Sequence, residues 1–253
     1  MPEAGVMPPV RVRRHTRRRG PSTESPVYRQ RPVERTGGGP AGDISQYGKY
    51  GTVGKSGAIV KGRRDYTLAD LESQIRETGS AKDIDFAAES AVSTLDDLLR
   101  FNVVPPTAIR EDVGGHLVSA QEIVPNSVKW WSTDDRRHEE VNKSDLFKIA
   151  IIDIIVNQGD RHGGNLLITP DNRAHAIDNE AIFSSYRKSV AVDYMWGKEI
   201  PKDILHKLKG LDKGDFTATF AGVGSSDDIE EAWDRKKHLE FTGIIDTSTP
   251  LED

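Results

Sequence analysis

The apolar residues of this chain fall into short blocks whose spacing alternates between helical and extended. Residues 86–101 place their apolar side chains on one helical face, and Asp85 in front of them is a suitable N-cap. Pro105 and Pro106 end this predicted helix. Two extended stretches, 107–110 and 116–124, follow with a short turn between them. A helix followed by a hairpin suits the smaller lobe of an α+β domain.

A second helix is predicted from Ser144 to about Asn157, with almost no polar face. A helix that is apolar on every side is buried at the centre of its domain. A charged loop, 158–165, follows it directly and reads QGDRHGGN. Stretches 166–168 and 174–177 then predict a hairpin that ends at Asp178.

The two flanks of this central region differ in character. Four glycines spaced by three, from Gly48 to Gly57, precede the short apolar run 58–60, which predicts a loop feeding a strand that ends at Lys61. This glycine spacing is not the one typical of phosphate-binding loops. The last third of the chain predicts amphipathic helices over 201–208 and 226–239, the second with a capping-box-like start at Ser226.

Charge is distributed unevenly over the 253 residues, whose formal net charge is −5. Residues 1–40 contain nine Arg and three acidic residues, a balance of +6, so the other 213 residues sum to about −11. Because the first 45 residues are also rich in proline and glycine, we predict a disordered tail there. Its arginines suit an acidic partner or a nucleic-acid backbone, and a solvated linker is the alternative.

Composition excludes several classes of protein. With no cysteine there is no disulfide framework, thiol nucleophile or zinc–thiolate site. The longest apolar run is far shorter than the roughly 20 residues that span a bilayer, and no apolar segment follows the basic N-terminus as in a secretory signal. We therefore expect no transmembrane segment and a cytoplasmic location.

The charged loop and the predicted hairpin bring several polar and acidic side chains into one region. The hairpin would place Asn165 and Asp178 side by side at one mouth. An amide oxygen beside a carboxylate is a hard ligand set that suits Mg²⁺ with phosphate as a further ligand. Asp160, slightly upstream, can orient and deprotonate an attacking hydroxyl. These groups are the ones that phosphoryl transfer requires.

Two segments resemble a known superfamily. Residues 154–168, IIVNQGDRHGGNLLI, and 176–183, AIDNEAIF, closely resemble the catalytic and metal-binding segments of the atypical protein kinase-like superfamily. That superfamily contains the phosphatidylinositol 3-/4-kinases, HipA-type kinases, actin-fragmin kinase and secretory-pathway kinases. The GDRHxxN pattern is specific, and a looser resemblance extends from about Gly57 to Leu239.

This resemblance implies an α+β, two-lobed protein kinase-like fold with a reduced N-terminal lobe and a mainly helical C-terminal lobe. The expected organisation is a disordered Arg/Pro-rich tail (1–45), a small ATP-binding lobe (46–125) and a large catalytic lobe (126–245). The implied activity is ATP- and Mg²⁺-dependent transfer of the γ-phosphate to a hydroxyl, with Ser or Thr of a protein as the expected acceptor. A phosphoinositide kinase and a nucleotide-binding pseudokinase scaffold are the alternatives.

Site residues follow from the resemblance position by position. It assigns catalysis to Asp160 and His162 and metal binding to Asn165 and Asp178. Arg161 is expected to be structural, paired with a carboxylate or a backbone carbonyl. The ATP contacts fall on further residues: Lys61 at the α/β-phosphates, Glu89 as its ion-pair partner, and the backbone of Glu122 to Val124 at adenine.

Several of these positions have alternatives. Lys55 competes with Lys61 for the phosphates, and Glu89 could be a solvated acid on the surface of its helix. Where many kinases have Asp-Phe-Gly this chain has Asp178-Asn179-Glu180, so Glu180 either adds an acid to the metal site or faces solvent. The pair 130–131, two tryptophans, is expected to be a packing contact, with a substrate-facing role as the alternative.

Overall fold

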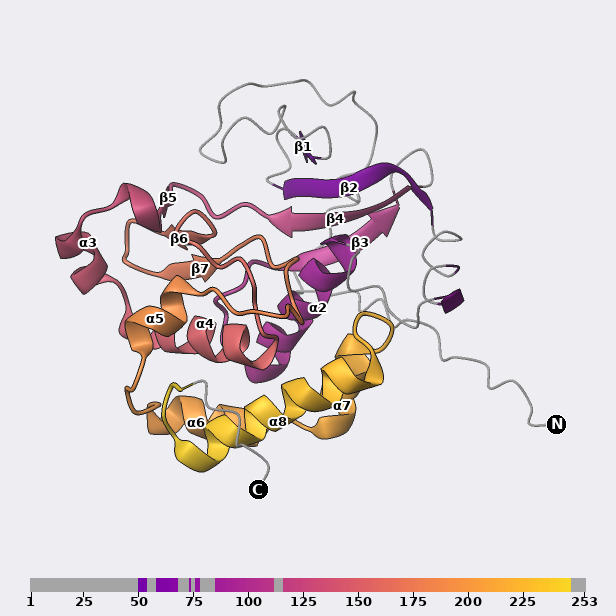
Figure 1. Ribbon diagram of the computed structural model, residues 1–253. Coiled ribbons are helices and arrows are strands. Elements are labelled where there is room, and N and C mark those ends of the chain that lie inside the picture. Colours follow the sequence, from indigo (N-terminus) through magenta and orange to yellow (C-terminus); the bar gives the residue numbers. More distant parts are fainter. Residues whose placement is uncertain are drawn as a thin grey trace, which may run out of the picture.

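The computed structural model describes residues 50–53, 58–67, 73, 76–77, 85–111 and 116–246, which form an α+β arrangement of two small antiparallel sheets and a set of helices (Figure 1). One sheet contains β1 (Tyr50–Val53), β2 (Ala58–Thr67), β3 (Thr107–Glu111) and β4 (His116–Glu122). The other contains β5 (Val128–Lys129), β6 (Leu166–Ile168) and β7 (Ala174–Ala176). The helices are α2 (Asp85–Leu99), the 3-10 turn η3 (Trp130–Ser132), α3 (Asp135–Glu140), α4 (Lys143–Ile155), α5 (Val190–Met195), α6 (Lys202–Lys209), α7 (Lys213–Phe220) and α8 (Ser226–Thr242).

The first sheet has the strand order β1-β2-β4-β3. The predicted hairpin is confirmed, because β3 and β4 pair antiparallel with Ile109 opposite Ser119. The prediction of a loop before Ala58 is wrong at Tyr50–Val53, which pairs with β2 as a strand. β2 also continues beyond Lys61 to Thr67, with a register irregularity after Gly62. Pairing on both sides of β2 stabilises a strand longer than its apolar run.

Helix α2 packs against this sheet and ends earlier than its apolar pattern indicates. It stops at Leu99, because Arg100 and Asn102 both adopt left-handed backbone conformations (φ 54° and 58°). The buried carboxylate of Asp96 then accepts a hydrogen bond from the Val103 amide at 3.1 Å. The prolines that follow are therefore not what ends the helix.

Helix α4 forms the centre of the core, as its sequence predicts. Every residue from Ile149 to Ile155 is buried, Asp153 included. The Asn142 side chain caps its N-terminus by accepting from the Ser144 amide at 2.9 Å. In Figure 1, α2 and α4 lie between the first sheet and helices α6 to α8.

The second sheet has the order β5-β6-β7 and contains the predicted 166–177 hairpin. Leu166 pairs with Ala176 and Ile168 with Ala174, so the hairpin is present, and its register places Asn165 opposite Ile177, one residue before Asp178. The Ala176 amide also donates to the Val103 carbonyl at 2.8 Å, which ties β7 to the end of α2.

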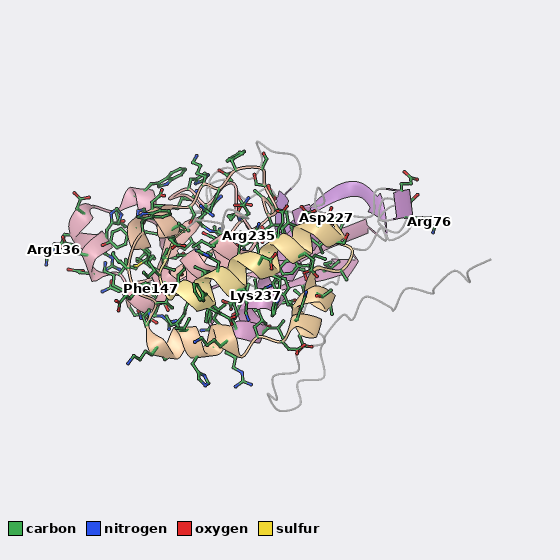
Figure 2. The ribbon with its side chains drawn as sticks, turned by 60° about the horizontal axis from the view of Figure 1, so that its bottom comes forward. Arg76, Arg136, Phe147, Asp227, Arg235 and Lys237 are labelled. Carbon is green, nitrogen blue, oxygen red and sulfur yellow. The ribbon has the colours of Figure 1, made fainter. Side chains whose placement is uncertain are left out.

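Helices α6 and α8 confirm the two C-terminal helices expected from the sequence. The capping box of α8 is one residue earlier than expected, because it is the Ser225 side chain that bonds the Asp228 amide while Asp228 bonds the Ser225 amide. Arg235 of α8 reaches the last carbonyls of α4, Ile154 and Ile155, at 3.0 Å each (Figure 2). A guanidinium at a helix C-terminus satisfies carbonyls that have no partner in the helix.

Helices α3, α5 and α7 were not predicted from the sequence. α3 and α5 are six residues long, too short to show a clear helical period, and the eight residues of α7 bury only Phe216 and Phe220. Their N-caps are Asp134, Ser189 and Asp212, whose side chains bond backbone amides of the first turn.

The Arg/Pro-rich tail, Gly48, Gly54 and Gly57 lie outside the described residues, so those interpretations remain predictions. The proposed domain boundaries near residues 45 and 125 and the division into two lobes also remain predictions. Within the described part of the chain, no helix is both long and apolar enough to cross a membrane.

Candidate active site

The charged loop 158–165 leaves the buried end of α4 through a tight change of direction. Asn157 has a left-handed backbone (φ 47°), which asparagine tolerates better than most residues. The Gln158 amide then bonds back to the Asp153 carbonyl at 2.9 Å, and its side-chain oxygen accepts from the Asp160 amide at 3.1 Å. These bonds set the position from which Asp160 projects.

Arg161 is the centre of a buried polar network. Its guanidinium pairs with Asp153 (Nη2 to Oδ1, 3.1 Å), and both side chains have no exposed surface. It also donates to the carbonyls of Asn165 (3.3 Å) and Ile177 and to the side-chain oxygen of Asn179. The predicted structural pairing of Arg161 is thus what the structure shows. One side chain joins α4, the loop and the segment after β7.

Asp160 and Asn165 lie at the two ends of the same loop turn. The Asn165 side-chain nitrogen donates to the Asp160 carbonyl at 2.9 Å, so the amide oxygen is the atom left for another ligand. The Asn165 amide bonds the His162 carbonyl at 2.9 Å, which closes the turn. The Asp160 side chain is 51% exposed, so its carboxylate is accessible to a substrate.

His162 lies beside Asp160 with a defined ring orientation. Its Nδ1 accepts a hydrogen bond from the Gly164 amide at 2.9 Å, which places the proton of the neutral ring on Nε2. Nε2 is 3.9 Å from Oδ2 of Asp160. This separation is longer than a hydrogen bond.

Asp178 follows β7 and comes directly after Ile177, the residue that lies opposite Asn165 in the hairpin. The Ile177 amide donates to the Asn165 carbonyl at 3.0 Å. Asp178 itself has a left-handed backbone (φ 61°), which turns the chain out of the strand. The mouth of the hairpin therefore carries an amide side chain at one end and a carboxylate at the other.

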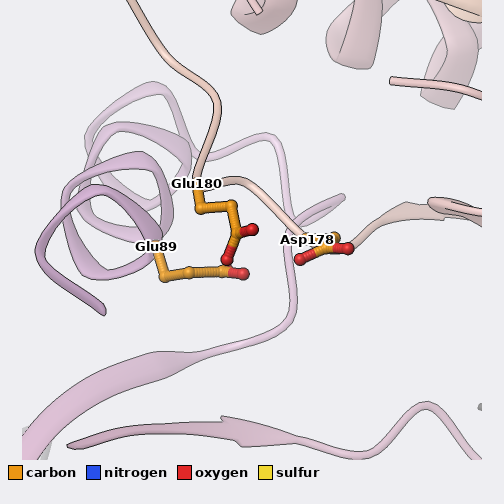
Figure 3. A group of neighbouring side chains, drawn as sticks. All are labelled: Glu89, Asp178 and Glu180. Atoms are coloured by element: carbon orange, nitrogen blue, oxygen red, sulfur yellow. The ribbon is translucent and has the colours of Figure 1, made fainter. Parts of the chain in front are cut away.

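Three carboxylates converge at this point. Oxygen atoms of Glu89, Asp178 and Glu180 lie within 4.8 Å of one another, with Glu89 coming from α2 and the other two from the segment after β7 (Figure 3). Of the two alternatives for Glu180, the structure therefore shows the position beside Asp178. A set of carboxylate oxygens at this spacing suits Mg²⁺, a hard cation that prefers oxygen ligands.

Glu89 is buried, with 1% of its surface exposed, so the alternative of a solvated surface acid is wrong. Its Oε2 accepts from the side-chain amides of Gln121 on β4 and Asn179, at 3.4 Å each. Asn179 in turn accepts from Arg161. A chain of polar contacts thus runs from α4 through the loop to α2 and the first sheet.

The residues expected at ATP are only partly described. Position 61 pairs with Ser119, which places it on the same face of the sheet as Ser119 and Gln121. The side chain of Lys61 lies outside the described residues, and so does Lys55 altogether. Glu122 ends β4, and its amide already donates to the Pro106 carbonyl at 2.9 Å. Any backbone contact to a base must therefore use another group of the 122–124 segment, which includes Val124.

Two contributors to this site, Gln121 and Asn179, were not predicted from the sequence, and a third, Trp131, was expected to be a packing contact. Gln121 and Asn179 hold Glu89, and Trp131 stacks on His162 with ring centroids 5.0 Å apart and planes 8° apart. Asn179 had a signal, because it directly follows Asp178 in the motif. Gln121 had none, since only tertiary packing brings it to the site. Of the two tryptophans, Trp130 is buried as the packing expectation requires, whereas Trp131 is exposed and lies against the loop.

Comparison with known proteins gives similarity to solved structures but no match to a family model or to a curated protein. A solved structure, the crystal structure of a Helicobacter pylori proinflammatory kinase, CtkA, is similar with 12% sequence identity, coverage of 75% of this chain and 85% of that chain, and a TM-score of 0.42. A similarity at this level does not extend to activity or to site residues.

Proposed function

We propose that this chain is an ATP- and Mg²⁺-dependent kinase that transfers the γ-phosphate to a hydroxyl, with Ser or Thr of a protein as the acceptor. One observation carries the proposal. An accessible carboxylate, Asp160, lies next to the buried Arg161, whose guanidinium also donates to the carbonyls of Asn165 and of Ile177, the residue before Asp178. This is the arrangement that in-line phosphoryl transfer uses, where positioning and charge neutralisation provide most of the catalysis.

Asp160 is the group that receives the proton of the acceptor hydroxyl. A general base must be accessible and held in place, and Asp160 meets both conditions because its side chain is half exposed while its backbone is bonded to Gln158 and Asn165. The hydroxyl oxygen then attacks the γ-phosphorus as the bond to the β-phosphate oxygen breaks. His162, 3.9 Å away, is placed to donate from Nε2 toward the hydroxyl or the γ-phosphate.

The donor set at the hairpin mouth fits magnesium. Asp178 and the side-chain oxygen of Asn165 would hold the ion, and Glu180 and Glu89 extend the acidic set behind Asp178. When bound, Mg²⁺ neutralises charge on the phosphates and on the transferring group. Arg161 donates to Asn179, and Asn179 donates to Glu89, and these two contacts keep the carboxylates in position.

The nucleotide would lie between the first sheet and this acidic cluster. Lys61 is proposed to bind the α- and β-phosphates, since its register position shares a face with Gln121, which contacts Glu89. Adenine would contact the backbone of the 122–124 segment through a group other than the Glu122 amide.

The direct test is transfer from γ-labelled ATP with Mg²⁺ to two acceptors, a Ser/Thr peptide mixture and vesicles containing phosphatidylinositol. We expect label on the peptides and at least about 100-fold slower transfer by Asp160→Asn, the loss typical of a missing general base. Asp203→Asn, an exposed acid on α6, is the matched control and should equal the parent.

Label on the lipid alone would replace the proposed acceptor by a phosphoinositide. Equal rates for Asp160→Asn and the parent would refute the role of Asp160. An ATP-dependent rise in melting temperature without any transfer would identify a nucleotide-binding scaffold instead of a kinase.

A further inference from the structure

An exposed tryptophan covers one face of the loop histidine. The indole of Trp131 lies parallel to the His162 ring, with centroids 5.0 Å apart and an interplanar angle of 8°. Trp131 is 59% exposed, so this contact is not part of the hydrophobic core. An exposed aromatic ring that stacks on a side chain next to Asp160 needs an explanation other than core packing.

Trp131 is held in place by its neighbour in sequence. Trp130 is buried and stacks on His138 with ring centroids 3.9 Å apart and an interplanar angle of 4°, and it makes a T-shaped contact with the Tyr194 ring. The Trp131 amide donates to the Gly163 carbonyl at 3.2 Å. The buried indole therefore anchors the turn, and the backbone bond fixes the exposed indole against the loop.

Gly164 shows how closely the two rings and the loop fit. A Cβ at Gly164 would lie 2.6 Å from the Trp131 ring and 2.7 Å from Cε1 of His162. No side chain fits there unless one of the rings moves. The absence of a side chain lets the Gly164 amide approach Nδ1 of His162 to 2.9 Å.

The geometry points to Trp131 as a positioning residue for His162. The indole limits rotation of the imidazole, and this keeps Nδ1 on the Gly164 amide and the Nε2 proton on the side of Asp160. This inference rests on the proposed function for its catalytic consequence, because an Nε2 donor at a fixed place is useful only if a hydroxyl or phosphate arrives there. The hydrogen bond and the stacking themselves do not depend on that function.

Two readouts test the inference, one of them independent of activity. The first is hydrogen exchange of the Gly164 amide, followed by NMR in the parent, Trp131→Ala, Trp131→Leu and Trp131→Phe. Without a ring to stack, we expect exchange to be about tenfold faster in the Ala and Leu variants, the factor for loss of one hydrogen bond. Phe retains an aromatic face and should restore most of the protection.

The second readout is phosphotransfer. We expect kcat to fall by about 10- to 100-fold in Trp131→Leu while KM for ATP stays within about twofold, as expected for a misplaced catalytic group. Rescue by Trp131→Phe should follow the exchange data. Trp196→Ala removes a comparably exposed indole (52%) on the turn after α5 and is the matched control for both readouts.

The outcomes separate the two claims. Unchanged Gly164 exchange in Trp131→Leu, or no recovery in Trp131→Phe, would overturn the positioning role whatever the activity. If the parent transfers no phosphate, the proposed function fails, while the exchange measurement still decides whether Trp131 positions His162. If exchange responds but kcat does not, His162 is positioned without a catalytic consequence and the inference fails in its functional part.

Discussion

The Arg161 guanidinium and the Asp153 carboxylate form an ion pair from which solvent is fully excluded. Asp153 interrupts the apolar run of α4, and Arg161 lies in the middle of the charged loop. The Ser189 hydroxyl donates to the same carboxylate at 2.7 Å. The position of Asp160 on the surface is thus fixed by a charge pair in the core.

Removing either charge of this pair should destabilise the protein strongly. We expect Arg161→Met to lower the free energy of unfolding by about 3–5 kcal/mol, because it leaves the Asp153 charge buried without its partner. Arg161→Lys should recover only a small part, since a lysine cannot reproduce the planar set of donors that contacts Asp153, Asn165 and Asn179. Urea unfolding of the purified variants measures both effects.

An exposed ion pair provides the comparison. Arg136 pairs with Glu140 on the surface of α3, where the arginine side chain is 87% exposed. Arg136→Met should change the unfolding free energy by less than about 1 kcal/mol. A similar small change in Arg161→Met would show that the buried network does not hold the loop.

Asp96 predicts a specific pH dependence of stability. Burial raises the pKa of this carboxyl from 3.8 to about 7. Between these two values the folded protein holds a proton that the unfolded chain has lost, so the stability contributed by Asp96 is fully present below about pH 4 and is lost as the pH rises to 7. The slope should be about 1 kcal/mol per pH unit in this window.

Asp96→Asn should remove this dependence, because its side chain stays neutral and keeps an oxygen for the Val103 amide. The measurement is the difference in unfolding free energy between parent and variant at pH 4, 5.5 and 7. Asp203→Asn, at an exposed acid on α6, reports the effect of removing one negative charge. A difference that stays constant with pH would contradict the raised pKa.

Nucleotide and metal binding should depend on Asp178. The test uses ADP, which cannot turn over. At about 100 times its dissociation constant, a ligand adds roughly 2.7 kcal/mol to the stability of the parent. We expect the rise in melting temperature with ADP and Mg²⁺ to be much smaller in Asp178→Asn and to disappear in the parent when EDTA is added. Asparagine tolerates the left-handed backbone at this position, so the variant tests the charge and not the turn.

Asp203→Asn is again the matched control and should retain the full rise with ADP and Mg²⁺. An equal rise in Asp178→Asn, or a rise that is insensitive to EDTA, would exclude Asp178 from the metal site.

The sequence could predict those parts of the site in which neighbours in sequence are also neighbours in space. The buried helix α4, the loop that follows it and the β6–β7 hairpin each have a strong local pattern, and together they place Asn165 opposite Ile177, the residue before Asp178. The structural role of Arg161 could be predicted as well, because Arg161 lies in the same loop.

The rest depends on packing between distant segments. Gln121 reaches Glu89 across 32 positions of the chain, and Asn179 does so across 90. No local period marks such contacts. The same reason explains β1, which is a strand because β2 pairs with it, and the stacking of Trp131 on His162, which follows from the turn at η3.

The central claim is that Asp160 serves as the base of a phosphotransferase, and intact-mass measurement tests it most directly. The parent and Asp160→Asn are incubated with ATP and Mg²⁺, alone and with a Ser/Thr peptide mixture, and the intact mass of each protein and peptide is then measured. We predict phosphate adducts, each about 80 Da, on the peptides or on the parent chain itself, and none above background with Asp160→Asn. Absence of adducts with the parent, or equal adducts with both proteins, would contradict the account.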